Sequence, residues 1–403
     1  MDVIDSPPKR LRRSPPGGQR QRPGEAGSAA FAWGGRFGLR LATFVRGLLG
    51  GLLAGSAATH AATLPEDKAE AMFHTYDGGG VKANGPAFLV RKSLVDRVSL
   101  QAQYYVDAVS NASIDVVTQA SAFKETRTAW ELGATTVVRD STLSLSLSRS
   151  TEPDYIADAV NVDLAHEVFG GQSTVSLGFT RGHDQVGKKG IPGWIDESLH
   201  WQYRAGLTQI LTPRWLVSLN AEALADSGYL ASPYRSARVF GAFVHENLPR
   251  TRSARAVKFR SINDTSAWVD HSSFRAEYRA YWDNWKIRAG TTEFAVSKGF
   301  GDRFLVDATL RFYSQSKALF YSDDAPAETL YITRNRQLSA FRSTGVGAKL
   351  TYAWPGLPAG YEVKLTGAYE RKNFRFSDFT DLRTKQPYSY DANVLQLYVS
   401  ATF

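Results

Sequence analysis

The chain ends with Leu395-Gln396-Leu397-Tyr398-Val399-Ser400-Ala401-Thr402-Phe403, where apolar and more polar residues alternate up to the last position. Successive side chains of a β-strand point to opposite faces, whereas a helix brings together residues three and four apart. This stretch therefore predicts a strand whose two faces meet different environments. Its apolar face carries Leu395, Leu397, Val399, Ala401 and Phe403.

The same period of two recurs along most of the chain upstream of this stretch. Clusters of turn-forming residues separate the alternating stretches, which include 98–106, 143–148, 174–180, 215–221, 274–282 and 346–352. A soluble β-sandwich also alternates. Strands of about 9 to 14 residues, however, suit a tilted crossing of a bilayer, whereas strands of soluble proteins average about five or six residues. We therefore expect an all-β fold, an antiparallel transmembrane β-barrel over residues 96–403.

The number of strands follows from the spacing of these stretches. About fourteen strands are expected and twelve to sixteen fit the pattern, since single-chain bacterial barrels have an even number. Two more stretches, 88–91 and 235–246, also alternate and would raise the count to sixteen. The expected strands cover 97–108, 124–138, 142–150, 155–167, 172–183, 197–211, 214–226, 253–262, 271–282, 285–297, 303–316, 338–354, 361–374 and 391–403. Short turns, for example 139–140 and 212–213, then face the periplasm, and longer loops such as 227–252 and 317–337 face outward.

The carboxy-terminal stretch resembles the last strand of bacterial outer-membrane proteins, which ends in an aromatic residue that the barrel-assembly machinery recognises. The resemblance implies that Phe403, with the other four residues of the apolar face, forms an assembly signal. Aromatic residues also lie near expected strand ends, as in the girdles at lipid interfaces, for example Trp130, Trp201, Trp215, Trp282, Trp354 and Tyr369. These features favour outer-membrane lipid and the barrel-assembly machinery as partners.

The first 61 residues have the composition of a leader. Residues 1–35 are rich in Pro, Gly, Arg and Gln, a composition that cannot bury a core. Arg36, Arg40 and Arg46 then precede the apolar stretch 47–58. A basic flank, a short apolar region and small residues predict a disordered extension plus a secretory signal peptide over 1–61, cleaved after Ala61 rather than Ala58. Residues 62–95 are expected to be a periplasmic segment that serves as a link or a plug, and the mature protein is expected in the outer membrane of a Gram-negative bacterium.

The composition excludes several classes of protein. The chain has no cysteine, which excludes disulfides, thiolate metal sites and a thiol nucleophile. The net charge is +9, but residues 1–61 hold nine Lys/Arg and three Asp/Glu, so the remaining chain has 39 basic against 36 acidic residues. A nucleic-acid partner is not expected, because phosphate binding needs clustered basic residues on the folded part.

Several short motifs resemble one family of proteobacterial proteins. They are Leu-Pro-Glu-Asp at 64–67, Tyr-Asp-Gly-Gly-Gly at 76–80, the stretches 104–107 and 113–117, Glu-Pro-Asp-Tyr at 152–155, and 178–184. Together they are similar to DUF3570, an uncharacterised outer-membrane β-barrel family, over roughly residues 63–403. The resemblance implies an outer-membrane location and supplies no catalytic or ligand residues. Its members are often encoded near flavin-transfer and thioredoxin-like proteins, which implies a link to envelope redox chemistry.

No constellation of catalytic or cofactor-binding residues stands out, so we expect neither enzymatic activity nor a bound cofactor or metal. The histidines are scattered singly, and none forms a metal-binding pair at i, i+2 or i, i+4. The one pair worth testing as a hydrolase site is His183–Asp184. A calcium site from Asp107, Asp115, Asp154 and Asp184 at the outer rim is less favoured than turn-forming roles for these residues.

Charged residues at polar positions of the strands are expected to line the interior. The candidates are Arg204, Arg275, Glu277, Arg279, Arg288, Arg311, Lys349 and Lys364. They form either a path for solutes or a salt-bridged lining that braces the wall. The leading hypothesis is a pore or passive transporter for small polar solutes with a slight preference for anions. The alternative is a plugged structural barrel that anchors a periplasmic or surface redox partner, based on the charged, weakly periodic segment 64–80.

Overall fold

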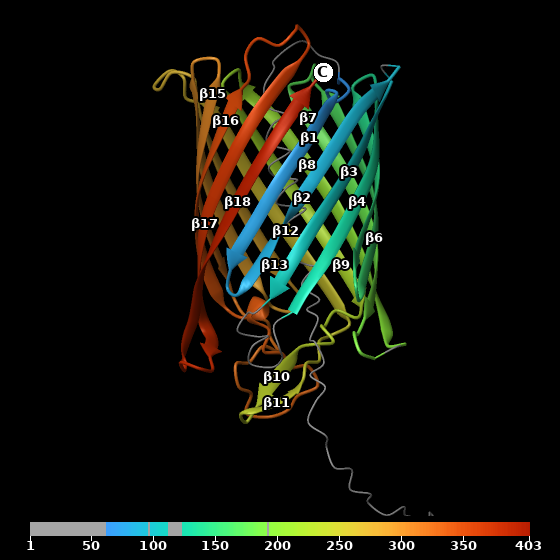
Figure 1. The fold of residues 1–403 in the computed structure, drawn as a ribbon, viewed down its shortest axis with the longest axis vertical. Helices are drawn as coiled ribbons and strands as arrows, with labels where there is room; N and C mark the ends of the chain where they lie inside the picture. Colours follow the sequence, from blue (N-terminus) through green and yellow to red (C-terminus); the bar gives the residue numbers. More distant parts are fainter. Residues whose placement is uncertain (1–61, 96, 112–122, 192) are drawn as a thin grey trace, which may run out of the picture.

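The computed structural model describes residues 62–403 except 96, 112–122 and 192. Sixteen antiparallel strands form one closed barrel, in which sequence neighbours pair, β9 pairs with β12, and β1 closes the wall against β18 (Figure 1). The strands are β1 (Lys68–Gly78), β2 (Val81–Leu94), β3 (Val98–Asn111), β4 (Phe123–Val138), β5 (Ser141–Glu152), β6 (Tyr155–Val168), β7 (Ser173–Gly187), β8 (Ile195–Thr212), β9 (Trp215–Gly228), β12 (Thr251–Asp264), β13 (Ser272–Asp283), β14 (Arg288–Phe300), β15 (Phe304–Gln315), β16 (Phe341–Ala353), β17 (Glu362–Asp381) and β18 (Gln386–Thr402). The expected fold class is confirmed, and the strand number lies at the upper end of the expected range. The expected signal peptide lies outside the described residues.

The two ends of the barrel differ. At the terminal end, uppermost in Figure 1, Lys68 at the start of β1 pairs with Thr402 near the end of β18. Short turns join most strands there, such as residues 139–140 between β4 and β5. The opposite end, here called the loop end, carries the long connections 229–250 and 316–340. This asymmetry matches the expected division between short turns and long loops.

The segment expected to be a link or plug is part of the wall. The strands β1 and β2 pair along their whole length, and each also pairs with its other neighbour, β18 or β3. The assignment of 62–95 to a periplasmic segment is therefore wrong for residues 68–94. The two strands missing from the count of fourteen are β1 and β2, of which the pattern had indicated only 88–91.

The alternation of β2 is inverted, which explains why the pattern did not reveal it. Its apolar residues Val81, Ala83, Ala87 and Leu89 face inward and are buried. Between them, the pairing of β2 with β3 is interrupted at Gly85-Pro86. A Cβ atom at Gly85 would lie 1.9 Å from the carbonyl oxygen of Val106, so only glycine allows the two backbones to approach this closely.

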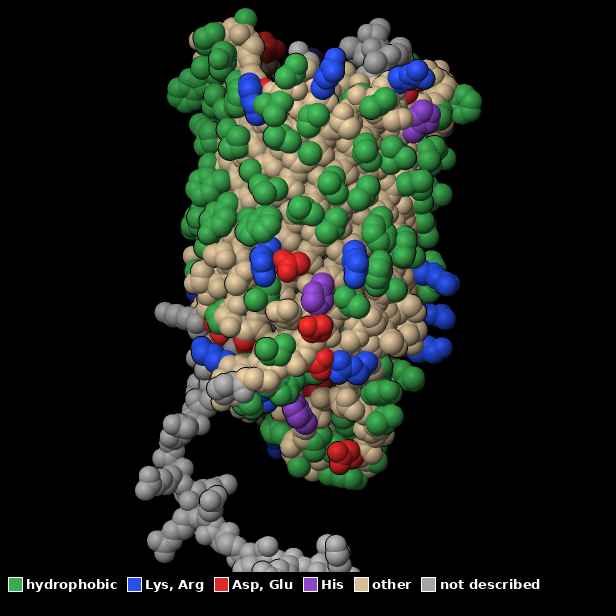
Figure 2. All heavy atoms as spheres, turned by 90° about the vertical axis from the view of Figure 1, so that its right-hand side faces the viewer, with side chains coloured by type: hydrophobic (Ala, Val, Ile, Leu, Met, Phe, Trp, Pro, Cys, Tyr) green, Lys and Arg blue, Asp and Glu red, His purple; other side chains and the backbone are tan. Residues whose placement is uncertain are grey.

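The outer surface of the wall carries an apolar band. The outward residues of successive strands are large and exposed, for example Leu132, Leu177, Leu219, Phe259, Tyr278, Val346 and Leu397. On the face of the barrel that Figure 2 shows, hydrophobic side chains spread over the middle and charged side chains lie toward the ends. Burying such a side chain gains about 1.5 to 3 kcal/mol, so a continuous band of this size is the lipid-facing surface of a transmembrane barrel. No helix in the described part of the chain is long and apolar enough to cross a membrane.

A compact cap lies at the loop end. The strands β10 (Ser236–Val239) and β11 (Ala242–His245) form a separate two-stranded sheet, which projects below the barrel in Figure 1. Residues 235–246 are thus a strand pair, as their alternation indicated, but they do not belong to the wall. Ala237 and Val239 of this sheet pack on Ala325 and Ile332 of loop 316–340, so the two long connections form one unit, called the cap below.

Candidate functional site: the barrel interior and its cap

The central part of the interior carries a belt of charged side chains from one side of the wall. Most basic residues bind an acidic residue on a nearby strand, as Arg204 binds Asp163 at 2.6 Å and Arg279 binds Glu222 at 2.9 Å. The belt has eight basic residues, Arg204, Lys258, Arg260, Arg275, Arg279, Arg311, Lys349 and Lys372, and six acidic residues, Asp163, Glu222, Glu277, Glu293, Asp307 and Glu370. The paired side chains stay between 15% and 52% exposed, so they face a space that admits water.

Arg311 on β15 is the exception within the belt. No ion-pair partner within hydrogen-bonding distance is found for it among the described residues, and its Nε atom is buried without a hydrogen bond. Glu293, opposite Arg311 on β14, binds Arg275 at 2.8 Å, and beyond Gly345 of β16 the residues Glu370 and Lys372 of β17 bind each other at 3.1 Å. The belt therefore has a cationic excess, with one guanidinium that no carboxylate neutralises directly.

The interior positions expected from the sequence agree with the structure except at one residue. The side chains of Arg204, Arg275, Glu277, Arg279, Arg311 and Lys349 lie in the belt, and Lys364 faces inward near the terminal end. Arg288, at the first position of β14, pairs with the outward-facing Trp282 and therefore points away from the lumen. Its assignment to the lining is wrong because the apolar Trp285 and Ile287, which set the expected alternation, are buried in the cluster under the cap and do not face lipid.

Outside the belt, the interior combines uncharged polar, apolar and charged side chains. Serines occupy the inward positions of β5, and Ser144 and Ser146 bond to Thr135 and Asn161 of the adjacent strands. The β18–β1–β2 side is apolar near the loop end, where Tyr76, Val81 and Ala392 belong to one cluster. Toward the terminal end the same side carries charge, since Lys68 and Glu70 of β1 bind each other at 2.8 Å.

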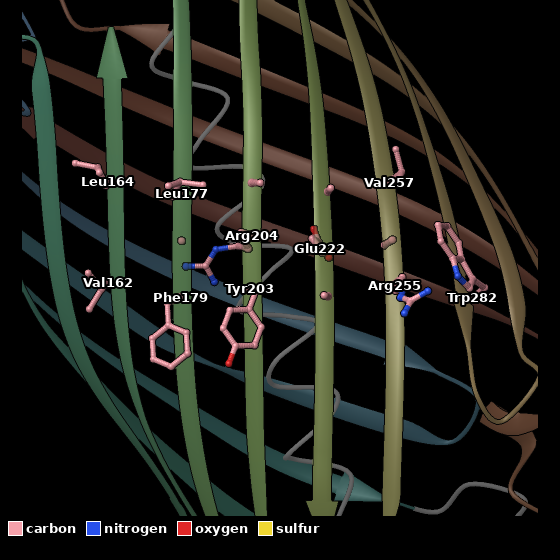
Figure 3. A pocket seen from close by; sticks show the side chains of 15 residues that line it. Val162, Leu164, Leu177, Phe179, Tyr203, Arg204, Glu222, Arg255, Val257 and Trp282 are labelled. Carbon is pink, nitrogen blue, oxygen red and sulfur yellow. The ribbon is translucent and has the colours of Figure 1, made fainter.

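A groove of about 610 Å³ lies on the outer side of the same wall. Figure 3 shows the labelled Tyr203 and Trp282 on strands either side of β9, whose Ala221 and Ala223 also line the groove. The lining is mainly outward-facing and apolar, so the groove belongs to the lipid-facing surface rather than to the lumen.

The pair considered as a hydrolase site is divided between the two faces of the wall. His183 points outward and lies 3.3 Å from Glu197, whereas Asp184 points inward and is buried. Asp184 bonds Nε2 of His200 at 2.9 Å, and Asp226 bonds the other ring nitrogen, Nδ1, also at 2.9 Å. Sequence reasoning missed this cluster, because the three residues come from three different strands.

Together with Ser198, this cluster has distances similar to those of a Ser–His–Asp catalytic triad. Its Oγ lies 3.2 Å from His200 Nε2, on the far side of the ring from Asp226. A triad, however, needs Nε2 free to accept the serine proton. Here Asp184 occupies Nε2, so the imidazole is held as a cation between two carboxylates. The arrangement braces β7, β8 and β9 and does not provide a general base.

A second buried histidine cluster joins β1 to β3. Nε2 of His74 lies 2.6 Å from Asp107 and 2.8 Å from the hydroxyl of Tyr105, whose ring stacks on the imidazole. Arg127 of β4 lies 3.9 Å from the same carboxylate. His74 had been placed before the barrel, yet it is one of the contacts that fix the first strand.

Three of the four rim carboxylates lie among the described residues and have other partners. Among the described residues no group of three or more His, Asp or Glu side chains is arranged to hold a metal ion. Asp107 and Asp184 belong to the two histidine clusters, Asp154 accepts a hydrogen bond from Tyr234, and Asp115 lies outside the described residues.

Two arginines anchor the cap in the mouth of the barrel. Arg336 is 2% exposed, and its guanidinium lies 5.6 Å from the ring of Tyr388 and 5.4 Å from that of Tyr390, both on the inner face of β18. Arg334 binds Asp323 at 2.7 Å and the carbonyl of Thr380, and lies 4.3 Å from the ring of Phe379. Loop 316–340 thus packs against the inner face of the long hairpin β17–β18.

Comparison with known families supports the resemblance inferred from the sequence. Residues 194–364 match the family described as "Protein of unknown function (DUF3570)". The resemblance to this family is confirmed. The match begins downstream of every motif on which the resemblance was based, so it rests on β8 to β16 and the cap. No curated protein is significantly similar to the chain.

Solved structures with a similar fold are bacterial β-barrels of low sequence identity. The siderophore receptor PirA from Pseudomonas aeruginosa has 12% identity and a TM-score of 0.41, over 79% of this chain and 60% of the receptor. CdiB from Acinetobacter baumannii has 8% identity and a TM-score of 0.45, over 83% and 60%. A bacterial polysaccharide outer membrane secretin has 8% identity and a TM-score of 0.48, over 83% and 97%. The chain thus spans about 60% of the first two proteins.

Proposed function

We propose that the protein is an outer-membrane pore for small polar solutes, restricted at its loop end by the cap and weakly selective for anions. The observation that carries this proposal is the belt of partly exposed charged residues inside an apolar-coated barrel. A wall braced only for stability gains little from ion pairs, because pairs in contact with water contribute about 0 to 1 kcal/mol each. Polar groups facing water across a membrane are, by contrast, what a hydrophilic solute needs.

The packing of the cap indicates that the mouth of the barrel at the loop end is restricted rather than open. Leu338 and Tyr321 of loop 316–340 are buried in one cluster with Phe376 and Tyr388 of the hairpin β17–β18. This packing holds the loop against that side of the wall. Solutes would therefore pass along the charged side of the lumen, between the belt and the cap.

The orientation follows from the general rule for such barrels. Short turns and the carboxy terminus lie in the periplasm, and long loops lie outside. The cap would then face the cell exterior, and Phe403, Ala401, Val399, Leu397 and Leu395 would be presented to the barrel-assembly machinery on the periplasmic side. Support for this assembly signal comes from the outward alternation of the same residues on β18, where Leu397 is half exposed.

The alternative, a plugged barrel that anchors a redox partner, has lost the observation on which it depended. That observation was the weak periodicity of residues 64–80. Most of this segment is β1, whose register is continuous with both neighbouring strands. The cap itself remains a surface that a partner could contact, so this alternative is tested together with the pore.

The proposal is tested by conductance of the purified full-length protein in planar bilayers. We expect steady single-channel conductance and an anion-to-cation permeability ratio slightly above one. Arg311→Gln removes the belt guanidinium without a carboxylate partner and should bring this ratio toward one. Arg288→Gln, which removes an outward charge of the same kind, should leave it unchanged. A folded protein without conductance, even after the cap is cleaved by protease, would refute the pore and return the search to a partner of the cap.

A further inference from the structure

The outer face of the hairpin β17–β18 carries a cluster of basic side chains at the loop end. Arg371 and Arg375 lie four residues apart on β17, and both point outward, as does Asn373 between them. Arg342 of β16 pairs in register with Arg375, so the two guanidinium groups start from directly opposite positions on the same face. We call Arg342, Arg371, Arg375 and Asn373 the arginine patch.

Carboxylates balance only part of this charge. Asp391 of β18 binds Arg371 at 2.6 Å and also accepts a hydrogen bond of 2.7 Å from Asn373. Arg375 reaches only the amide oxygen of Asn373, at 3.0 Å. Arg342 has no side-chain partner among the described residues. Three guanidinium groups therefore share one carboxylate.

Like charges directly opposite each other on a sheet destabilise the pairing of their strands. Two arginines in this position, with an amide as their only nearby acceptor, indicate that an anion from outside the chain completes the patch. Arginine suits this role because its planar fork binds phosphate through two parallel hydrogen bonds.

The surroundings of the patch identify the kind of anion. Directly toward the middle of the wall lie exposed apolar side chains, with Val346 paired opposite Arg371 and Phe312 opposite Thr344. A ligand that rests on both surfaces has a phosphorylated head and acyl chains. The patch spans four residues along β17, about 13 Å, and one strand spacing across. That size exceeds one phosphate and suits a sugar headgroup with more than one.

We infer that the arginine patch binds the phosphates of a glycolipid in the outer leaflet, whose acyl chains lie on the apolar band below it. This inference rests on the proposed orientation with the loop end outside. It is independent of conductance, because the patch and the lumen lie on opposite faces of the wall.

The test measures binding of bis-phosphorylated lipid A to the delipidated full-length protein in detergent. Dephosphorylated lipid A and phosphatidylglycerol are the comparison lipids. Arg342→Gln combined with Arg375→Gln should weaken binding about 30-fold, the loss expected for two arginines at an anionic lipid surface. Asp391→Asn removes the competing carboxylate and should strengthen binding.

Arg149→Gln is the matched control. Arg149 is also an outward arginine, but it pairs with Asp158 at 3.4 Å and lies on β5, away from the patch. Its removal should leave the affinity unchanged, and the heat-dependent gel mobility of folded barrels should confirm that each variant is folded. If the double variant does not fold, Asp391→Asn still tests the inference, because it should raise the affinity for lipid A.

Three results would overturn the inference. The first is unchanged affinity in the folded double variant or in Asp391→Asn. The second is equal binding of dephosphorylated lipid A, since phosphate would then not be the group recognised. The third is equal binding of phosphatidylglycerol, which would assign the patch to any phosphate lipid. Conductance measured on the same preparations distinguishes failure of the lipid site from failure of the pore. If the double variant conducts like the wild type and binds lipid A with unaltered affinity, the lipid site alone is overturned.

Discussion

Arg334 provides the most direct test of whether the cap is a fixed part of the barrel. Its side chain is 1% exposed and binds Asp323 within loop 316–340 at 2.7 Å. It also donates to the carbonyl of Thr380 at 2.6 Å and lies 4.3 Å from the ring of Phe379, so it joins the loop to β17. Arg334→Ala leaves the backbone carbonyls of Asp323 and Thr380 without this donor, and the carboxylate of Asp323 keeps only the hydrogen bond that it accepts from the amide of Thr380.

The expected cost follows from the burial of this contact. Removing one partner of a buried ion pair costs about 3 to 5 kcal/mol, because the other charge stays buried without compensation. Asp323 remains 24% exposed, which allows partial hydration and favours the lower part of this range. The local free energy of opening the cap should therefore fall by about 3 kcal/mol, which corresponds to roughly a 150-fold change in the opening equilibrium.

Hydrogen exchange measured by mass spectrometry reports this change. The amide of Ser322 donates to Thr333 and that of Ile332 to Asn247, so both exchange only when the cap opens. Their protection should fall about 150-fold in Arg334→Ala, while amides of the wall keep theirs. Arg383→Ala is the control, because its pair with Asp381 is 62% exposed on the arginine side and is therefore weakened by water. Equal effects of the two variants would refute the reasoning that burial makes the cap rigid.

Three further predictions concern the wall, assembly and pH. In Gly85→Ala the new Cβ atom would lie 1.9 Å from the backbone carbonyl oxygen of Val106, so denaturant unfolding should show a loss of about 1 to 3 kcal/mol. Phe403→Ala should lower the fraction of heat-modifiable, folded protein in outer membranes, and an unchanged fraction would exclude an assembly role. Burial raises the pKa of Glu246 in the cap above its ordinary value of 4.5, so the packed cap takes up a proton more readily than the opened one. Its stabilisation is complete below pH 4.5 and declines as pH rises through the raised pKa, so protease cleavage of the cap should accelerate with pH in the parent and not in Glu246→Gln.

The sequence predicted the wall well where lipid and water lie on fixed sides of a strand. Alternation over 143–148 or 395–403 has one physical cause, the pleat of a strand between two solvents, so face and register follow from it. The same reasoning fails at β2, where inward Val81 and Ala83 meet other apolar groups inside the barrel. A strand that is apolar on its inner face loses the contrast on which the pattern depends.

Interior contacts between distant strands could not be predicted for a different reason. Asp184, His200 and Asp226 meet because two registers bring β7, β8 and β9 together, and neither register is encoded in the local pattern. Arg288 was misplaced for the same reason, since its face depends on the register in which it pairs with Trp282. The cap was read as loop and strand, but its packing against β17 depends on contacts between Arg334, Arg336 and aromatic residues far away in sequence.

The charged belt was expected to be either a path for solutes or a brace for the wall, and the geometry makes these two roles compatible. A carboxylate 2.6 to 2.9 Å from a guanidinium braces two strands but cancels most of the field that the pair exerts on a passing ion. Selectivity must then come from the small cationic excess, of which Arg311 is the residue without a carboxylate partner at hydrogen-bonding distance. A pore lined in this way should discriminate weakly between ions, and the residual preference should decline as added salt screens exposed charges over about 10 Å at 0.1 M. Strong anion selectivity that persists in molar salt would contradict a lining of paired charges.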